Sequence, residues 1–530
     1  MAHESYTLSV RDPNRPKPVT TQANIEQFTT AEALENQGTP WEPYEDSKYE
    51  SPINRLVPFP AFYWLRWKLL SVFHTRLLFG FVLGELIVIL ALLGGLAAAL
   101  AVIGQGGGGG DDETEASGAV AIIPPALAYA FATRNSLWTL FTGLPFERAL
   151  FWHKLCAYLT VIVGSWHGYV SREWDWSGIL LTGAFAALSI FSFWPIRRRL
   201  FEWWLRFHWV LFILAIVAAL LHDSAGILFG VGVWGLDLIL RILIAVVNRK
   251  RHRSILAVRL PSNVIRITFS KEDFEYKAGQ YCFLCVPGVS MFEWHPFSIS
   301  SSPHEATVSL HIRVLGDWTQ QLYDYVKDTR PINVYIDGPY GAPGVDVDGD
   351  KYKVFLFVSG GIGITPMQSI CNDILHQRRR GRDIRKVIFV WSVRDLYMVT
   401  SVLDYDKEYF AKVSDHRLPM SFCPDLLIRK ESSGVLENYF HLSRERDSSK
   451  FAEANIHPDI QPDLKFGRPD ITALFSKVKA CASELGETRV AVLTCGPSSL
   501  VDSVEKLCVR NSSCGCGGVK FDLHKEIFEF

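Results

Sequence analysis

Four histidines in two apolar stretches have the side chains and the spacing to hold metal centres. His153 and His167 lie in one stretch, His208 and His222 lie in another, and both pairs are separated by 14 residues. In an α-helix this interval spans about 21 Å and nearly four turns, so the two members of a pair share one face. A neutral imidazole inside a bilayer is costly without a partner, and a b-type haem with two axial histidines supplies one. The spacing therefore predicts two stacked haems, one near each surface of a bilayer about 30 Å thick.

Apolar segments supply the helices that must position these histidines. The apolar residues concentrate between positions 77 and 247, and this region predicts six membrane spans. We place the spans at 79–104, 119–133, 150–170, 178–194, 203–221 and 226–247. The tract GGGGGDDETE at 106–115 is expected to be a water-exposed loop between the first two spans.

Basic residues predict the orientation of these spans. RRR at 197–199 and NRKRHR at 248–253 fall on one side of the membrane, whereas DDETE at 111–115 falls on the other side. The positive-inside rule places the basic side, and with it both termini, in the cytosol. The third and fifth spans then both run outward. The first histidine of each pair therefore belongs to an inner haem and the second to an outer haem.

Length and composition limit the remaining organisation. A chain of 530 residues is expected to hold two or three domains, and its net charge of −1 gives no sign of nucleic-acid binding. Residues 1–75 read as a mostly disordered cytosolic tail, followed by the membrane domain at 76–248. Short strands with Gly/Pro turns then predict a small antiparallel barrel at 249–345, and alternating strands and helices predict a parallel α/β domain at 346–530.

A glycine-rich loop marks a nucleotide site in the α/β domain. VFLFV at 354–358 is a buried strand that runs into Gly360, Gly361 and Gly363. A strand, a glycine loop and a helix in this order suit a phosphate, because glycine lets the backbone approach the oxygens. Arg394 follows a second strand and is expected to meet an adenosine 2′-phosphate, which favours NADPH over NADH; the alternative partner of Arg394 is Asp395.

Six motifs in a fixed order carry a family resemblance. They are HPFSISSSP (295–303), HIRVLGDWT (311–319), DGPYG (337–341), GGIGITP (360–366), WSVRD (391–395) and CGP (495–497). Together with the four histidines they make the chain, from about Leu77 onward, resemble the ferric reductase/NADPH oxidase family of transmembrane flavocytochromes b. The resemblance implies a six-span helical membrane domain with two b haems. It also implies a cytosolic ferredoxin-NADP reductase-like module, in which the antiparallel barrel binds FAD and the α/β domain binds NADPH.

The resemblance also assigns the flavin-binding residues. In the family pattern HPFS lines the isoalloxazine ring, which places His295, Pro296, Phe297 and Ser298 there. The guanidinium of Arg313 suits the FAD pyrophosphate. Trp318 and Thr319 are expected to open a helix whose N-terminus favours the same anion.

The nucleotide side is assigned in the same way. The expected ligands there are the glycine loop with Thr365 and Pro366, and Gly496 with Pro497. Cys495 is expected at the nicotinamide. The final residues, KFDLHKEIFEF, resemble the aromatic-ended tail that covers the flavin in NADPH oxidases and plant respiratory burst oxidases. Phe528 aligns with the family's last residue, but this chain continues to Phe530, so both residues are candidates for the aromatic ring.

The resemblance implies an NADPH-dependent transmembrane oxidoreductase of the plasma membrane. Electrons pass from cytosolic NADPH through FAD and two haems to an acceptor on the opposite side. Dioxygen is slightly favoured, as in superoxide-generating NADPH oxidases. A ferric or cupric chelate is the alternative, since HPFSISSSP is closer to plant ferric-chelate reductases and Ser171 stands where oxidases have a further histidine. An alternative of another class is a non-catalytic haem-binding membrane subunit or sensor.

Overall fold

The computed structural model describes residues 111–133, 146–172, 175–247, 251–403 and 434–526, with short gaps inside the last two ranges, and a few positions between 90 and 101. The chain divides into two compact units, one over Pro52–Arg249 and one that contains Lys250–Phe530. All three expected domain boundaries, at 75/76, 248/249 and 345/346, lie outside the described residues.

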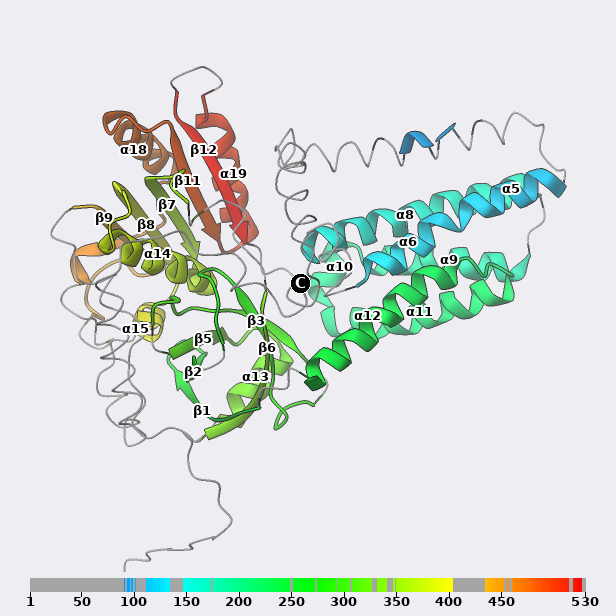
Figure 1. The fold of residues 1–530 in the computed structure, drawn as a ribbon, viewed down its shortest axis with the longest axis horizontal. Coiled ribbons are helices and arrows are strands. Elements are labelled where there is room, and N and C mark those ends of the chain that lie inside the picture. The colour runs from blue at the N-terminus through cyan, green and yellow to red at the C-terminus, as the bar shows by residue number, and fades with distance from the viewer. Residues whose placement is uncertain are drawn as a thin grey trace, which may run out of the picture. The chain divides into compact units, whose positions relative to one another are not determined.

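The first unit is helical (Figure 1). Its described helices are α5 Asp111–Ala121, α6 Ile123–Phe131, α8 Phe146–Ser171, α9 Trp176–Phe191, α10 Trp194–Arg199, α11 Phe201–Leu221 and α12 Ile227–Val247. Helices α6, α8, α9, α11 and α12 lie over the expected second to sixth spans, whereas most of the first span lies outside the described residues. Among the described residues one helix, over Trp203–Leu221, is long and apolar enough to cross a membrane.

One expectation in this unit is wrong. The acidic tract at 111–115 was expected to be a loop, but it forms the first turns of α5. Aspartate and glutamate are favourable at a helix N-terminus, because their negative charge complements the unpaired backbone N–H groups there. The acidic residues therefore start a helix.

The helices of this unit pack through small and aromatic side chains. Helix α8 contacts α5, α6 and α9, while α11 contacts α9 and α12 contacts α6. The buried cluster between them contains Tyr129, Ala184, Phe185, Ala215, Ala219 and Ile227. The alanines let the helix backbones approach closely, as is common where helices pack inside a membrane. The tyrosine hydroxyl donates to the Phe212 carbonyl oxygen at 3.2 Å.

The second unit begins with an antiparallel barrel. Its strands are β1 Arg251–Leu260, β2 Val264–Ser270, β3 Tyr281–Cys285, β4 His295–Ser298, β5 Thr307–Arg313 and β6 Pro331–Tyr340, in the order β4-β3-β6-β1-β2-β5. A bridge between Ile299 and Leu310 links the end of β4 to β5. Helix α13 Asp317–Tyr325 follows β5 and buries Trp318 and Leu322.

A parallel sheet with helices on both faces follows the barrel (Figure 1). Its strands are β7 Val354–Gly360, β8 Lys386–Val393, β9 Leu436–Leu442, β10 Leu464–Phe466, β11 Arg489–Cys495 and β12 Lys520–Glu526, in the order β10-β9-β8-β7-β11-β12. The helices are α14 Ile364–Arg379, α15 Tyr397–Leu403, α18 Ile471–Glu484 and α19 Ser498–Asn511, with 3₁₀ turns η3 Gly361–Gly363 and η5 Gln461–Asp463.

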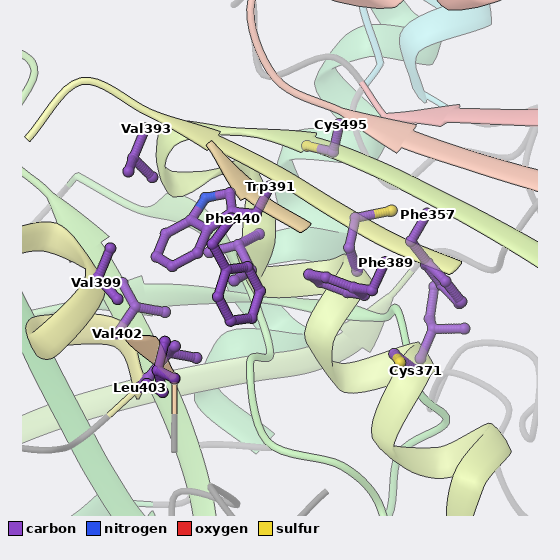
Figure 2. Close-up of a cluster of buried hydrophobic side chains, with 14 of the residues drawn as sticks. Phe357, Cys371, Phe389, Trp391, Val393, Val399, Val402, Leu403, Phe440 and Cys495 are labelled. Atoms are coloured by element: carbon purple, nitrogen blue, oxygen red, sulfur yellow. The ribbon is translucent and has the colours of Figure 1, made fainter. Parts of the chain in front are cut away.

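Large apolar side chains fill both faces of this sheet. One cluster combines Phe357, Phe389 and Trp391 with residues of α14 and α15 (Figure 2), and the other combines strand valines with α18 and α19. The first cluster also contains Leu256 and Val258 of the barrel strand β1. Part of the barrel therefore joins the hydrophobic core of the α/β domain, while most of its buried residues form a cluster of their own.

Candidate functional site

The strand order places a topological switch point at the carboxyl end of the parallel sheet. From the central strand β7 the chain builds outward through β8, β9 and β10, then crosses to the other side for β11 and β12. The strands β7 and β11 are adjacent, and the chain that follows each of them builds the sheet in the opposite direction. In open α/β sheets this topological switch point is where ligands bind. The GGIG and CGP motifs are the two loops that leave these strands.

Backbone contact between the two loops requires glycine. Gly496 has φ +151°, and a Cβ built on it would lie 2.9 Å from the Gly360 nitrogen. A Cβ on Gly363 would lie 2.6 Å from the Cys495 carbonyl oxygen. A side chain at either position would force the two loops apart. The structure thus brings together two motifs that lie more than a hundred residues apart in the sequence.

Gly361 connects the glycine loop to the barrel. Its φ is +56°, and its carbonyl oxygen accepts a hydrogen bond from Trp391 Nε1 at 2.8 Å. A Cβ on Gly361 would lie 3.4 Å from Arg313 Nη1. The guanidinium expected at the FAD pyrophosphate therefore lies beside the loop expected at the nucleotide phosphates. Thr365, in the first turn of α14 beside Pro366, donates to the Ile362 carbonyl oxygen at 3.1 Å and so steadies this turn.

An aromatic cluster surrounds the HPFS segment. His295 lies 4.3 Å from Trp318 between ring centroids, and Phe297 lies 5.9 Å from Trp318 with the planes 26° apart. Pro296 is half-buried and Ser298 is buried, in register with Phe283 and Tyr281 of β3. Trp318 thus packs against the segment expected to line the isoalloxazine ring.

Thr319 shapes the loop in front of α13. Its Oγ1 accepts from the backbone nitrogens of Leu315 and Gly316, both at 3.0 Å, and donates to the Gly316 carbonyl oxygen at 2.8 Å. These bonds cap the helix, whose first residue is Asp317. The threonine hydroxyl is therefore engaged with the backbone between Arg313 and the helix.

Two partners are possible for Arg394 from the sequence, an adenosine 2′-phosphate and Asp395. The structure joins the Asp395 carboxylate to the Tyr397 backbone nitrogen, at 3.0 Å, and to the Ser262 hydroxyl. Arg394 itself is exposed at the carboxyl end of β8. Its guanidinium is therefore placed where it can meet an anion from solvent.

Two neighbours of Arg394 were missed in the sequence. Ser443 follows β9, and its backbone nitrogen and hydroxyl both donate to the Val393 carbonyl oxygen at 2.8 Å. Arg444 comes next and is exposed. Val393 and Leu442 are paired in the parallel register of β8 and β9, so the residues after them emerge at one edge. The run SRER after an apolar strand was the available signal.

The four histidines form two facing pairs between α8 and α11. The ring centroids of His153 and His208 are 6.3 Å apart, and those of His167 and His222 are 6.2 Å apart. An imidazole nitrogen binds a metal at about 2 Å, and the centre of its ring lies about 1 Å beyond that nitrogen. Two imidazoles on opposite sides of one ion therefore have ring centroids about 6 Å apart. The separations therefore fit an iron between the members of each pair.

Hydrogen bonds of the His153–His208 pair also fit axial ligation. His153 Nδ1 lies 2.7 Å from the Ala128 carbonyl oxygen, which can only accept, so this nitrogen carries the proton and Nε2 keeps its lone pair. His208 Nδ1 is buried and has no hydrogen-bond partner within the described part of the chain. Within the described residues, neither ring has a hydrogen-bond partner on Nε2, the nitrogen that a haem iron would take.

Of the three expected catalytic residues, only Cys495 lies among the described residues. Cys495 ends β11 and is fully buried, as a member of the first cluster (Figure 2). Phe528 and Phe530 lie outside the described residues. The position of the aromatic tail therefore stays a prediction from the sequence.

Comparisons with known proteins agree with these two cofactor domains. A family model described as an FAD-binding domain matches residues 250–344, and one described as a ferric reductase NAD binding domain matches residues 352–509. The two matches confirm the expected FAD and nicotinamide nucleotide cofactors. A ferredoxin NADP+ reductase from Neisseria gonorrhoeae is similar with a TM-score of 0.34 and 14% identity, over 52% of this chain and 98% of that one.

Curated relatives are similar over part of the chain. Dual oxidase 2 of Sus scrofa is 29% identical over 349 residues, 63% of this chain and 22% of that protein. NADPH oxidase 1 of Mus musculus is 30% identical over 279 residues, 51% of this chain and 44% of that protein. This chain thus spans less than half the length of either relative. The resemblance seen in the six motifs is confirmed, since the two domain matches and these relatives support similarity to the ferric reductase/NADPH oxidase family.

Proposed function

We propose that this protein is an NADPH-dependent transmembrane oxidoreductase that moves electrons from cytosolic NADPH through FAD and two b haems to an acceptor across the membrane. The observation that carries the proposal is the pairing of four imidazoles at metal-sharing distances in a chain that also has flavin and nucleotide domains. Dioxygen is favoured as the acceptor, in keeping with relatives named NADPH oxidase and dual oxidase.

The surface of the helical unit supports a membrane location. Helix α11 has the length and hydropathy of a span, and large apolar side chains cover its exterior. Ile213 is 56% exposed and Leu220 is 52% exposed, which is unfavourable in water but favourable against lipid. We propose a plasma-membrane protein with both termini in the cytosol, divided into a tail at 1–75, a membrane domain at 76–248, an FAD barrel at 249–345 and an NADPH domain at 346–530.

The residues of the reductase unit have separate tasks in this proposal. When bound, FAD takes up two electrons from NADPH and releases them one at a time, which suits haems that carry single electrons. The glycine loops bind the nucleotide phosphates through their backbone, and Arg394 with Arg444 holds the 2′-phosphate. HPFS and Trp318 hold the flavin ring, while Cys495 borders the nicotinamide.

The histidine pairs limit how the acceptor can react. With both imidazoles of a pair bound to it, an iron held there would have no open position, so an acceptor would receive its electron without binding to the iron. His167 and His222 are the outer pair in the orientation predicted by the basic residues. A ferric or cupric chelate is the second candidate, and Ser171, at the end of α8, supports it, because a histidine one turn past the outer ligand is absent from that position.

Turnover with a single acceptor tests the function. The purified full-length protein, loaded with FAD and haem, is given NADPH and either dioxygen or ferric citrate, and the haem spectrum and the acceptor product are recorded. We expect reduced haem bands and superoxide. Product from ferric citrate alone would favour the metal reductase, and haem that NADPH never reduces would favour a non-catalytic subunit or sensor. His167→Ala and His222→Ala should each remove one haem and spare reduction of FAD by NADPH.

A further inference from the structure

The two histidines of the outer pair are held by the same dipeptide on two different helices. Ser117 in α5 lies against His167, with 2.7 Å between Oγ and Nδ1. Ser177 in the first turn of α9 lies against His222, with 3.0 Å between the same atoms. In both places a glycine follows the serine, at positions 118 and 178. We call each serine and its glycine a Ser-Gly clamp.

The glycines let the imidazoles rest on the helix backbone. A Cβ on Gly118 would lie 3.3 Å from His167 Cε1. A Cβ on Gly178 would lie 2.8 Å from His222 Cε1 and 3.2 Å from its Nε2. Any side chain at position 178 would therefore push the ring away or occupy the nitrogen that should face the iron. The serine fixes one edge of each ring, and the glycine leaves room for its other edge.

The serines also fix where the imidazole protons lie. A hydroxyl has one proton to give. Ser117 Oγ donates its proton to the Thr114 carbonyl oxygen at 2.9 Å, and Ser177 Oγ donates to the Asp175 carboxylate. Each serine can then only accept from the imidazole. Nδ1 therefore carries the proton in both rings, and Nε2 presents its lone pair.

Asp175 makes the two clamps unequal. This residue is the N-cap of α9, and its Oδ2 lies 3.2 Å from His222 Nδ1, close enough to share the proton that Ser177 accepts. Among the described residues, His167 has only the neutral hydroxyl of its own clamp. A carboxylate that accepts from a ligating imidazole raises the basicity of that ligand. An electron-rich ligand stabilises ferric iron, so hydrogen bonding to the axial ligands tunes the potential of a haem.

We propose that the two Ser-Gly clamps are positioning elements for the ligands of the outer haem, and that Asp175 lowers the potential of this haem by making His222 the more electron-rich ligand. The inference rests on the proposed function, because it takes the histidine pairs as haem ligands. A lower potential makes the outer haem a stronger reductant. The clamp on His222 therefore sets which acceptors the haem can reduce, and it favours a weak oxidant such as dioxygen.

Potentiometric titration of the full-length protein in lipid nanodiscs tests this proposal, with haem absorbance and electron paramagnetic resonance as readouts. Asp175→Asn should shift the ferric/ferrous equilibrium of one haem about tenfold toward the ferrous form, which is about 59 mV for one electron. The other haem should not change. Ser177→Ala should shift the same haem, and Ser177→Thr, which keeps the hydroxyl, should restore it. Ser165→Ala is the matched control, because this exposed serine of α8 donates only to the Val161 carbonyl oxygen.

The outcomes separate this inference from the function on which it rests. His167→Ala should leave a single haem, whose potential identifies the inner one; two haems retained in that variant would contradict the ligand assignment itself. With the ligands established, unchanged potentials in both Asp175→Asn and Ser177→Ala would overturn the clamp proposal. A shift of the inner haem would overturn it as well. Loss of the outer haem in Ser177→Ala with retention in Ser177→Thr would support it.

Discussion

The rings of His304 and His376 lie face to face across the contact between the barrel and the α/β domain. Their centroids are 4.1 Å apart and their planes differ by 5°. His304 lies in the loop between β4 and β5, and His376 lies near the end of α14. Burial lowers the pKa of His376 to about 4, helped by the positive charges of Arg380 and Arg379, and burial lowers the pKa of His304 well below its usual value.

This pair predicts a loss of stability in mild acid. Both pKa values are lower in the folded protein than in the unfolded chain, where a histidine titrates near pH 6.5. The stabilisation is therefore complete above pH 6.5 and is lost as the pH falls toward 4. After allowance for solvent screening, we expect the free energy of unfolding to fall by about 2 kcal/mol over this window. Denaturant unfolding of the FAD-loaded protein, followed by flavin fluorescence, measures it.

His376→Phe separates the titration from the stacking. Phenylalanine keeps an aromatic ring against His304 but carries no proton. We expect this variant to lose part of the pH dependence between 6.5 and 4 while its stability at pH 8 stays near that of the natural protein. An identical pH profile in both proteins would assign the acid sensitivity to other groups.

Gly363→Ala should damage nucleotide binding without loss of flavin. The new Cβ would lie 2.6 Å from the Cys495 carbonyl oxygen. This oxygen belongs to the backbone, so it cannot move aside as the end of a flexible side chain could. We expect the KM for NADPH to rise more than tenfold, or about 1.4 kcal/mol in binding. Gly235→Ala in α12, where a Cβ meets nothing within 4 Å, is the control. A normal KM in the Gly363 variant would mean that the two loops can separate freely.

Arg394→Ala and Arg444→Ala should each weaken the binding of NADPH more than the binding of NADH. Either variant loses a charge-assisted bond to the 2′-phosphate. We expect kcat/KM for NADPH to fall by an amount that corresponds to roughly 1–3 kcal/mol. Arg385→Ala is the control, since this arginine lies before β8, at the opposite end of the strand, and pairs with Asp383 and Glu487. Equal losses with both nucleotides would show that these guanidiniums do not read the 2′-phosphate.

The aromatic tail gives a prediction from the sequence. A ring over the flavin must move before nicotinamide can stack, so its removal should change the rate of flavin reduction by NADPH. Because Phe528 aligns with the final residue of the family, Phe528→Ala should alter stopped-flow reduction, whereas deletion of Glu529 and Phe530 should leave it nearly normal. The reverse result would assign the role to Phe530.

Local patterns in the sequence predicted the elements that depend on local physics. The apolar run at 354–358 followed by glycines predicted a strand and a phosphate loop, and β7 and η3 cover these residues. The 14-residue intervals likewise placed both histidines of each pair on one helix, and the structure brings the two helices together. Both patterns depend only on residues that are close together in the sequence.

Contacts set by tertiary structure were not predictable in this way. Ser443 and Arg444 join Arg394 only because β8 and β9 are paired in a particular register, some fifty residues apart in the sequence. The contact between the rings of Trp318 and His295 depends on how α13 folds back onto the barrel. The clamps on the outer histidines come from α5 and α9, and the first of these helices begins in a tract that was expected to be a loop.

The core shared by the barrel and the α/β domain means that these two cofactor domains cannot be treated as separable parts. Leu256 and Val258 of β1 belong to the same buried cluster as Phe357, and Ser369 of α14 donates to the Ser301 carbonyl oxygen of the barrel at 2.6 Å. Cleavage of the chain between the domains would leave these apolar side chains in water. We therefore expect damage in the flavin barrel to weaken the nucleotide loops, and the two halves to unfold in one cooperative transition.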